Sequence, residues 1–306
     1  MNGMFTRTWR RGLRRVSMSQ LVRHVDVVPE GDGQFIGQSV DLGWGRVYGG
    51  QTMAQGLAAA QQFVKSGHEV HQFGCQFLRG GDVSLPIVFD CDEIHRGRSF
   101  TSVHVRAMQN AKPILCMTAS FQAPEVGMEH QMGGLDPEWR RPDDLASMVE
   151  LMEPHLKHVP SKIRALYTEG GSPFDIRPTS FNSPWDVTVR TPSDAIWIRA
   201  KEELPDDLRV HQRLLTYASD WGLLATSLNP HPTALWAPDV RVASLSHSLH
   251  FHQPFRLDKQ WLCHAFRSPA SSGGRGYCIG EIWTEDGVLV ASTAQEGLIR
   301  RISIPE

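Results

Sequence analysis

Three polar residues lie in stretches whose pattern predicts packing inside the protein. Asp220 falls inside a predicted helix, and no cation stands three or four positions away to pair with it. Ser244 lies in the first strand-like run after that helix, and Gln295 lies in the apolar run over residues 287–297. A buried carboxylate needs polar partners, and a neutral amide both donates and accepts hydrogen bonds. Each residue alone is more often structural, but one helix packed on one sheet would bring the three together as a candidate site.

Other chemistries have weaker support. His247, His250 and His252 form the densest group of histidines, but strand alternation places His250 and His252 on one face and His247 on the other. No carboxylate follows at ligand spacing, so we expect no metal and no cofactor. The chain has no GxSxG motif for a serine hydrolase. The small-residue run 271–274 predicts a turn, because it lacks the lysine and the spacing of a phosphate loop.

Four basic residues are candidates for contact with an anionic ligand, although solvated charges at the rim of the protein explain them more simply: Arg79, Arg267, Arg300 and Arg301.

The composition is that of an ordinary globular protein. The chain has 306 residues, a net charge of -2, 41% hydrophobic residues and 21% charged residues. This charge does not favour a nucleic-acid partner, and no stretch approaches the ~20 apolar residues that a membrane helix needs. The chain has 5 cysteines, which are scattered and form no CxxC pair. This pattern argues against a zinc site of cysteines and against a disulfide framework. A reducing cytoplasm fits best.

The elements that would position the three residues repeat along the chain. A short helix (20–28) and short strands (35–40 and 46–48) come first. Gly49-Gly50 then opens a helix over residues 51–66, with apolar residues at helical spacing. Four strands follow, which implies an antiparallel sheet packed on that helix; they are predicted over residues 70–78, 86–94, 99–108 and 113–121.

The second half repeats this order. Strands over residues 185–189 and 195–200 precede a helix that begins near Leu204 and runs to about Leu228, with a proline and two acids at its start. Residues 97–100 (GRSF) are echoed by residues 274–277 (GRGY). We therefore predict a duplicated α+β chain, and we place Gln295 where Ser120 lies in the first half. Four strands follow the second helix, over residues 242–251, 261–267, 276–283 and 288–299.

The two halves are separated by a polar stretch. Residues 125–184 are dense in Gly, Pro and charged residues and predict a linker, with one short helix over residues 143–152. A linker of this length is long for a structureless loop, so part of it should lie along the surface of both halves. The first unit then covers residues 18–124 and the second covers residues 185–306.

Residues 1–17 form a basic leader. The first acid of the chain is Asp26, and such Arg-rich, acid-poor segments are typical of transit peptides. A disordered basic arm, or a natural start at Met18, fits the same composition. A mass measurement of the N-terminus would distinguish these readings.

Several segments, in order along the chain, resemble the acyl-CoA thioesterase II family. The resemblance covers about residues 18–301, and its motifs are specific as a set although each alone is weak. The leader falls outside it, which favours a start at Met18. The matching segments are residues 46–51 (RVYGGQ), 109–114 (QNAKPI), 118–125 (TASFQAPE), 197–200 (WIRA), 205–212 (PDDLRVHQ), 217–220 (YASD) and 286–297 (DGVLVASTAQEG).

The resemblance implies a double-hotdog fold, in which each of two tandem units is a long helix wrapped by an antiparallel sheet. It implies hydrolysis of fatty acyl-CoA to free acid and CoA, with Asp220, Ser244 and Gln295 as the catalytic set. The family usually has Thr at position 244, Asp at 246 and His at 74, where this chain has Ser244, Ser246 and Gly74. Ser244 keeps the hydroxyl oxygen and lacks only a methyl group. The Ser246 change is expected to remove a carboxylate near the site, and the Gly74 change to loosen a strand of the first half. Both put rate and substrate range in doubt more than the reaction class.

We expect water to attack the thioester directly, with Asp220 accepting a proton and with Ser244 and Gln295 fixing the water. Acyl-CoA is the expected partner, with no nucleic acid and no membrane, and the protein is expected to be a homo-oligomer, a dimer or tetramer. The C-terminal residues 302–306 lack a Ser-Lys-Leu ending, so a cytoplasmic location is expected. Two alternatives stay open: a non-catalytic acyl-CoA-binding protein and a double-hotdog enoyl-CoA hydratase.

Overall fold

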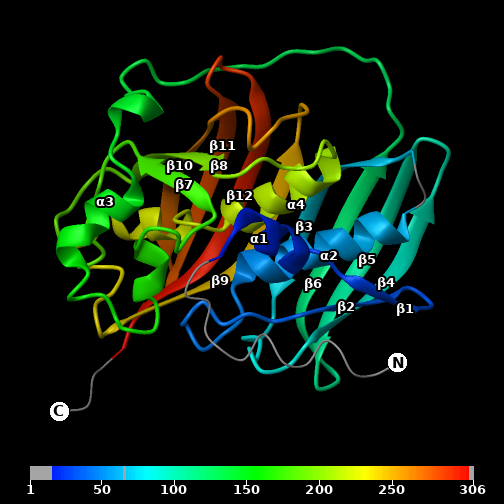
Figure 1. Ribbon diagram of the computed structural model, residues 1–306, viewed down its shortest axis with the longest axis horizontal. Coiled ribbons are helices and arrows are strands. Elements are labelled where there is room, and N and C mark those ends of the chain that lie inside the picture. Colours follow the sequence, from blue (N-terminus) through cyan, green and yellow to red (C-terminus); the bar gives the residue numbers. More distant parts are fainter. Residues whose placement is uncertain (1–15, 65–66, 303–306) are drawn as a thin grey trace.

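The computed structural model describes residues 16–64 and 67–302 (Figure 1). The predicted leader lies almost wholly outside these described residues. The helices are α1 (Met18–His24), α2 (Gly49–Phe63), α3 (Met148–Met152) and α4 (Leu208–Ser219). The strands are β1 (Val28–Gly31), β2 (Gln34–Gly37), β3 (Glu69–Phe77), β4 (Ile87–Arg96), β5 (Phe100–Gln109), β6 (Lys112–Gln122), β7 (Phe174–Pro178), β8 (Ser193–Ala200), β9 (Val240–Phe251), β10 (Leu262–Ser272), β11 (Arg275–Thr284) and β12 (Leu289–Arg301).

Among the described residues, the strands form one 12-stranded sheet in the order β1-β2-β4-β5-β6-β3-β9-β12-β11-β10-β8-β7. The two halves join at β3 and β9, which pair antiparallel with Gly74 opposite Ser248 and Cys75 opposite His247. Helices α2 and α4 pack against each other and lie across one face of the sheet (Figure 1). The predicted α+β class, with a helix and an antiparallel sheet in each half, is confirmed.

α2 and α4 run antiparallel, so the start of each helix lies beside the end of the other. At one end, Arg209 in the first turn of α4 donates to the carbonyl oxygen of Gln61 near the end of α2 (3.3 Å). Between the helices, the Gln61 and Gln212 side chains form a buried hydrogen bond (3.0 Å). The small residues Ala58 and Ala59 of α2 are fully buried, because a thin helix lets the sheet and α4 approach closely.

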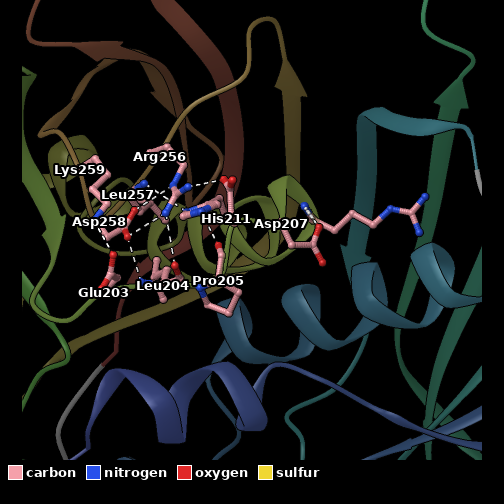
Figure 2. Close-up of polar contacts among 11 residues, drawn as sticks. Glu203, Leu204, Pro205, Asp207, His211, Arg256, Leu257, Asp258 and Lys259 are labelled. Atoms are coloured by element: carbon pink, nitrogen blue, oxygen red, sulfur yellow. Dashed lines mark hydrogen bonds and ion pairs between the residues drawn. The ribbon is translucent and has the colours of Figure 1, made fainter.

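A polar network holds the start of α4 (Figure 2). Asp207 is the N-cap residue, and its carboxylate accepts a hydrogen bond from the Arg209 N–H at 2.9 Å. His211 bridges two loops, since its Nδ1 accepts from the Leu257 N–H (3.3 Å) and its Nε2 then donates to the Pro205 carbonyl (3.2 Å). These contacts fix the helix whose other end carries Asp220.

Next to this network, Arg256 and Asp258 form an ion pair at 3.0 Å, and the Asp258 carboxylate also accepts from the Leu204 N–H at 2.9 Å. Burial acts to raise the pKa of Asp258, but these hydrogen bonds outweigh it and hold the pKa at about 2. Asp258 therefore stays ionised and anchors the loop that leads into α4.

The segment predicted as a linker has more structure than expected. β7 forms inside it and pairs antiparallel with β8, whereas the strand predicted over residues 185–189 does not form. There, Asp186 accepts a hydrogen bond from the Thr188 N–H (2.8 Å), which turns the chain. Trp185 packs instead against Trp236, with ring centroids 4.9 Å apart.

Two other predicted elements also differ. The helix predicted over residues 143–152 is broken, because Ser147 starts a new helix by accepting a hydrogen bond from the Glu150 N–H. Residues 46–48 form no strand; the Val47 N–H donates to the carbonyl of Gly81 in a loop.

The segment after β6 runs past the strand ends at the top of the view towards α3 (Figure 1). Its residues pack in two separate clusters of the second half. On the face opposite the helices, Trp197 donates from its indole to the Arg140 carbonyl (3.1 Å). Near α4, this segment supplies a cluster of buried residues made of Met152, Val159, Ile163 and Tyr167. The same segment also contacts the first half, since Lys162 and Ile163 lie against Gly43.

Candidate active site

Asp220 lies at the end of α4 rather than in its interior, where it was predicted. The helix ends at Ser219, and Asp220 is its C-cap residue. Gly222 adopts a left-handed backbone conformation with a φ of 80°, which an α-helix cannot continue. The chain resumes as a 3₁₀ helix, η4 (Leu224–Leu228). The predicted helix to Leu228 was therefore wrong, and the break at Gly222 leaves the Asp220 side chain at the helix end.

The structure brings the three predicted residues into direct contact. The Asp220 Oδ1 accepts a hydrogen bond from Gln295 Nε2 at 2.7 Å and from the Ser244 hydroxyl at 3.4 Å. Gln295 Nε2 also donates to Ser244 Oγ at 2.8 Å. A fourth group, the Gly50 backbone N–H, donates to Asp220 Oδ2 at 3.0 Å. The carboxylate is therefore held by donors from two strands and by the first turn of α2.

A β-bulge aims Ser244 at this cluster. Gln295 pairs with His247 across β12 and β9, and both side chains are buried on the helix side. Strict alternation from His247 would turn Ser244 to the opposite face. However, Ser246 pairs with Glu296 and Ser244 with Gly297, so β9 carries one extra residue at Leu245. The bulge returns Ser244 to the side of the sheet that faces Asp220.

Burial dominates the electrostatics of the site. It raises the pKa of Asp220 to about 6, although the hydrogen bonds to its carboxylate act to lower it. The first turn of α2 offers Asp220 the positive end of a helix dipole. A carboxylate with a pKa near neutrality is suited to accept a proton and to release it again.

The corresponding positions of the first half are apolar. The C-cap residue of α2 is Val64, where α4 has Asp220. β3 has a bulge at His71 that matches the bulge of β9, and this register places Val70 and Phe121 where Ser244 and Gly297 pair.

The same register places the buried Ala119 at the position of Gln295. The predicted match of Gln295 with Ser120 was wrong, because Ser120 lies on the outer face and contacts His71. The carboxylate, hydroxyl and amide are thus replaced by Val, Val and Ala, and the first half lacks this chemistry.

A cavity of about 520 Å³ opens onto the cluster and is lined by Asp220, Ser244 and Gln295 together with Trp236 and Phe266. A neighbouring cavity of about 450 Å³ shares part of its wall with the first; the shared residues are Tyr48, Met148, Tyr167 and Trp221. Volumes of this size, with mainly apolar walls and a few convergent polar groups, are typical of small-molecule sites.

His247 supports the turn that carries Asp220. Ser219 donates its hydroxyl proton to the Thr216 carbonyl (3.0 Å), so its oxygen accepts from His247 Nε2 (3.1 Å). Burial lowers the pKa of His247 to about 3, which keeps the ring neutral. His250 and His252 are exposed on the other face, as strand alternation predicted. In the described parts of the chain, no group of three or more His, Cys, Asp or Glu residues is placed to hold a metal ion.

Sequence reasoning missed Gly49 and Gly50 as parts of the site. A Cβ atom on Gly49 would lie 2.7 Å from Asp220 Oδ2, and one on Gly50 would lie 2.3 Å from the Tyr217 carbonyl oxygen. Only glycine lets the start of α2 approach the carboxylate this closely. The Gly-Gly pair at a predicted helix start was the available signal, since it has no advantage for the helix itself.

Two of the three departures from the family pattern, at positions 74 and 246, lie outside the site. Gly74 and Ser246 line a hollow on the outer face of the sheet, next to Cys116 and Tyr277. Neither residue lines the cavity that holds Asp220. The expected loss of a carboxylate near the site is therefore a change on the opposite face of β9.

Each half of the chain is a long helix packed on an antiparallel sheet. This arrangement, present twice in one chain with one polar cluster where the helices meet, is a double-hotdog fold. Comparison with known proteins agrees. The acyl-CoA thioesterase family model matches residues 167–298, and the model of the acyl-CoA thioesterase N-terminal domain matches residues 40–122.

Individual proteins extend this match over most of the chain. The sequence is 36% identical to acyl-CoA thioesterase 2 of Haemophilus influenzae, over 87% of this chain and 92% of that protein. It is 33% identical to acyl-coenzyme A thioesterase 8 of Homo sapiens, over 83% of this chain and 81% of that protein. The crystal structure of an acyl-CoA thioesterase II from Mycobacterium marinum superposes with a TM-score of 0.73 at 30% identity, covering 92% of this chain and 98% of that chain. This chain belongs to the acyl-CoA thioesterase family.

Proposed function

We propose that this protein hydrolyses fatty acyl-CoA thioesters to free acid and CoA, with Asp220, Ser244 and Gln295 as the catalytic residues. Family membership supports the reaction, and the convergence of the three side chains at 2.7–3.4 Å supports the assignment of the residues. The single observation that carries the proposal is the buried Asp220 carboxylate, which opens onto a cavity and makes no ion pair with any residue that the structure describes.

In this mechanism, a water hydrogen-bonded to Asp220 attacks the thioester carbonyl carbon. Asp220 accepts the proton as the carbon–oxygen bond forms, and the carbon–sulfur bond then breaks. The proton passes to the departing thiolate, which leaves as CoA, and Asp220 returns to its ionised form. A positioned general base contributes roughly 10²–10⁴-fold to such a reaction.

Ser244 and Gln295 orient the water and the carboxylate. Both N–H groups of the Gln295 amide are used, one on Asp220 and one on Ser244. Its Oε1 is buried and has no hydrogen-bond partner among the described residues, so it is the acceptor that can fix the second proton of the water. Positioning of this kind supplies much of the rate in reactions without a covalent intermediate.

The first turn of α2 has a further role at the thioester. Backbone N–H groups of a first turn have no partner within the helix, and they favour negative charge. The Gly50 N–H is used on Asp220 Oδ2 (3.0 Å), and Gly49 lines the catalytic cavity beside it. The oxyanion that forms on the thioester carbonyl is stabilised by this positive helix end.

The proposal is tested by release of the CoA thiol from saturated acyl-CoA substrates of short to long chain length. We expect turnover, with no lasting acyl-enzyme by mass spectrometry. Saturable binding without thiol release would contradict the proposal and favour a binding protein. Hydration of an enoyl-CoA in place of thiol release would assign the site to the hydratase class.

Two finer expectations belong to this proposal. We infer a cytoplasmic enzyme and a homo-oligomer, a dimer or tetramer. In the described part of the chain, none of the helices has the length and apolar character to cross a membrane. Cell fractionation tests the location. Light scattering after size-exclusion chromatography tests the assembly, and a monomeric mass at micromolar concentration would contradict it.

A further inference from the structure

A basic groove lies beside the catalytic cavity. It has a volume of about 410 Å³, and Leu228 and Thr233 line both the groove and the cavity, so the two spaces adjoin. Three arginines and the small residues of the β10–β11 turn make up most of its polar wall: Arg275, Arg300, Arg301, Ser271, Ser272 and Gly274. No acid lines this groove among the described residues, and two of the arginines face acids just outside it, so its excess positive charge comes from Arg300.

Arg300 is the unpaired charge of this groove. Arg275 and Arg301 each face an acid, Glu296 at 2.9 Å and Asp239 at 3.7 Å. In residues 16–64 and 67–302, the Arg300 guanidinium makes no ion pair and no hydrogen bond, and the side chain is exposed. Its cross-strand neighbour on β9 is a second cation, Arg241. Like charges opposite each other in a sheet are unfavourable, so an anion at this position would relieve their repulsion.

The backbone of the β10–β11 turn, which lies beside Arg300, is largely uncovered by side chains of the described residues. Gly273 and Gly274 both adopt left-handed conformations, with φ values of 58° and 74°. A Cβ atom on Gly274 would meet nothing closer than 3.9 Å. The wall next to the arginines thus offers serine hydroxyls and open backbone, and the guanidinium group matches the geometry of phosphate oxygens.

The spacing along β12 suits an acyl-CoA. Gln295 lies in the catalytic cluster and Arg300 in the groove, five residues further along the same strand, which corresponds to roughly 17 Å. The odd number of residues turns the two side chains to opposite faces of β12, so Arg300 reaches the groove around the end of the strand. In acyl-CoA, the pantetheine arm separates the thioester sulfur from the diphosphate by roughly 13 bonds, or roughly 15 Å when extended. A thioester at Asp220 therefore places its phosphates near Arg300 when the arm runs past Leu228 and Thr233.

We propose that this groove binds the phosphate groups at the nucleotide end of the CoA moiety, with Arg300 as the main contact. This inference rests on the proposed function, since it takes acyl-CoA as the substrate. Charge-assisted hydrogen bonds between arginine and phosphate are among the stronger polar contacts. The groove contributes to binding and not to bond cleavage, so its loss should raise KM and leave kcat nearly unchanged.

The test compares Arg300→Glu with the wild-type protein on three thioesters of one acyl chain: the acyl-CoA, its 3′-dephospho form and the acyl-pantetheine, which has no phosphate. We expect Arg300→Glu to raise KM for the acyl-CoA about tenfold at low salt and to leave KM for the acyl-pantetheine unchanged. If Arg300→Glu raises KM equally for the 3′-dephospho substrate, Arg300 contacts the diphosphate. If KM for that substrate does not change, Arg300 contacts the 3′-phosphate. Arg300→Lys should keep most of the affinity.

The matched control is Arg98→Glu. Arg98 is exposed and lies in the equivalent turn of the first half, so the same charge reversal there should change no KM. An unchanged KM for acyl-CoA in Arg300→Glu would overturn the inference. An equal rise on acyl-pantetheine would also overturn it, because the effect would then act through the catalytic cavity. Titration calorimetry with free CoA separates the two proposals, since Arg300→Glu should weaken this binding whether or not the thioester is cleaved.

Discussion

At the scale of single residues, the site depends on one carboxylate held by several donors. Asp220 contacts Gln295, Ser244 and the Gly50 N–H, and each belongs to a different element. The carboxylate is costly to bury, and that cost is what moves its pKa to about 6. A structural acid in a core is normally paired with a cation, so its burial without one indicates a chemical role.

The pKa of Asp220 predicts the pH dependence of the reaction. The base form of Asp220 is ionised, so kcat/KM should be constant well above pH 6 and should fall as the pH drops through about 6. One pH unit below that value, about a tenth of the plateau rate remains. Steady-state assays of a stable acyl-CoA from pH 5 to pH 9 check this. A profile that stays flat to pH 5 would mean that another group supplies the base.

Ser244 tests whether a hydroxyl is the required feature. Its oxygen donates to Asp220 and accepts from Gln295. Ser244→Thr keeps both roles and should retain most of the activity. Ser244→Ala should lower kcat about tenfold or more, because the amide loses an acceptor and the carboxylate loses a donor. Equal rates for the two variants in the thiol-release assay would remove the hydroxyl from the mechanism.

At the scale of elements, the site is built where the end of α4 meets the start of α2. The start of α2 has no side-chain cap of its own, and the Asp220 carboxylate from the second half accepts its Gly50 N–H. Gly49 makes this approach possible. The two halves of the chain therefore share one active site, although the three proposed catalytic side chains come from the second half.

A pair of glycine substitutions in α2 tests this meeting point. Gly49→Ala places a methyl group 2.7 Å from Asp220 Oδ2, so it should displace the carboxylate and lower kcat/KM by about tenfold or more. Gly56→Ala is the matched control, because its Cβ would lie no closer than 3.5 Å to any neighbour. That variant should keep its activity and gain up to about 1 kcal/mol of stability. Equal losses in both variants would point to a general effect on α2.

Local pattern predicted the long helices and the strands that follow them, because helical spacing and turn residues act over a few positions. It failed where a single residue changes the path of the chain. Gly222 ends α4 before Leu228, and the bulge at Leu245 reverses the face of Ser244. The resemblance supplied Asp220, Ser244 and Gln295, but sequence alone could not place Gly50 beside them, since that contact spans 170 positions.

At the scale of the whole molecule, one sheet and one pair of packed helices join the halves. β3 pairs with β9, and α2 packs on α4 through buried residues that include Gln61 and Gln212. The duplication has become asymmetric, with Val64, Val70 and Ala119 where the second half has its polar cluster. The first half thus contributes scaffold and the start of α2, and the second half contributes the acid, the hydroxyl and the amide.

This joint core predicts a single cooperative unfolding transition. Tryptophan fluorescence reports mostly on the second half, since among the described residues Trp44 alone precedes residue 124. Far-UV circular dichroism reports on both halves. The midpoints of thermal or urea unfolding should coincide for the two probes. Separate midpoints would show that the halves unfold independently, against the shared core.

The most direct measurement of the central claim is thiol release from a long-chain acyl-CoA by Asp220→Asn beside the wild-type protein. We predict that the variant folds and loses at least about 10²-fold in kcat. Its stability above pH 6 should be equal or higher, because a group whose folded pKa is raised costs stability once it ionises, here at most about 3 kcal/mol. Wild-type turnover by a folded Asp220→Asn protein would contradict the account.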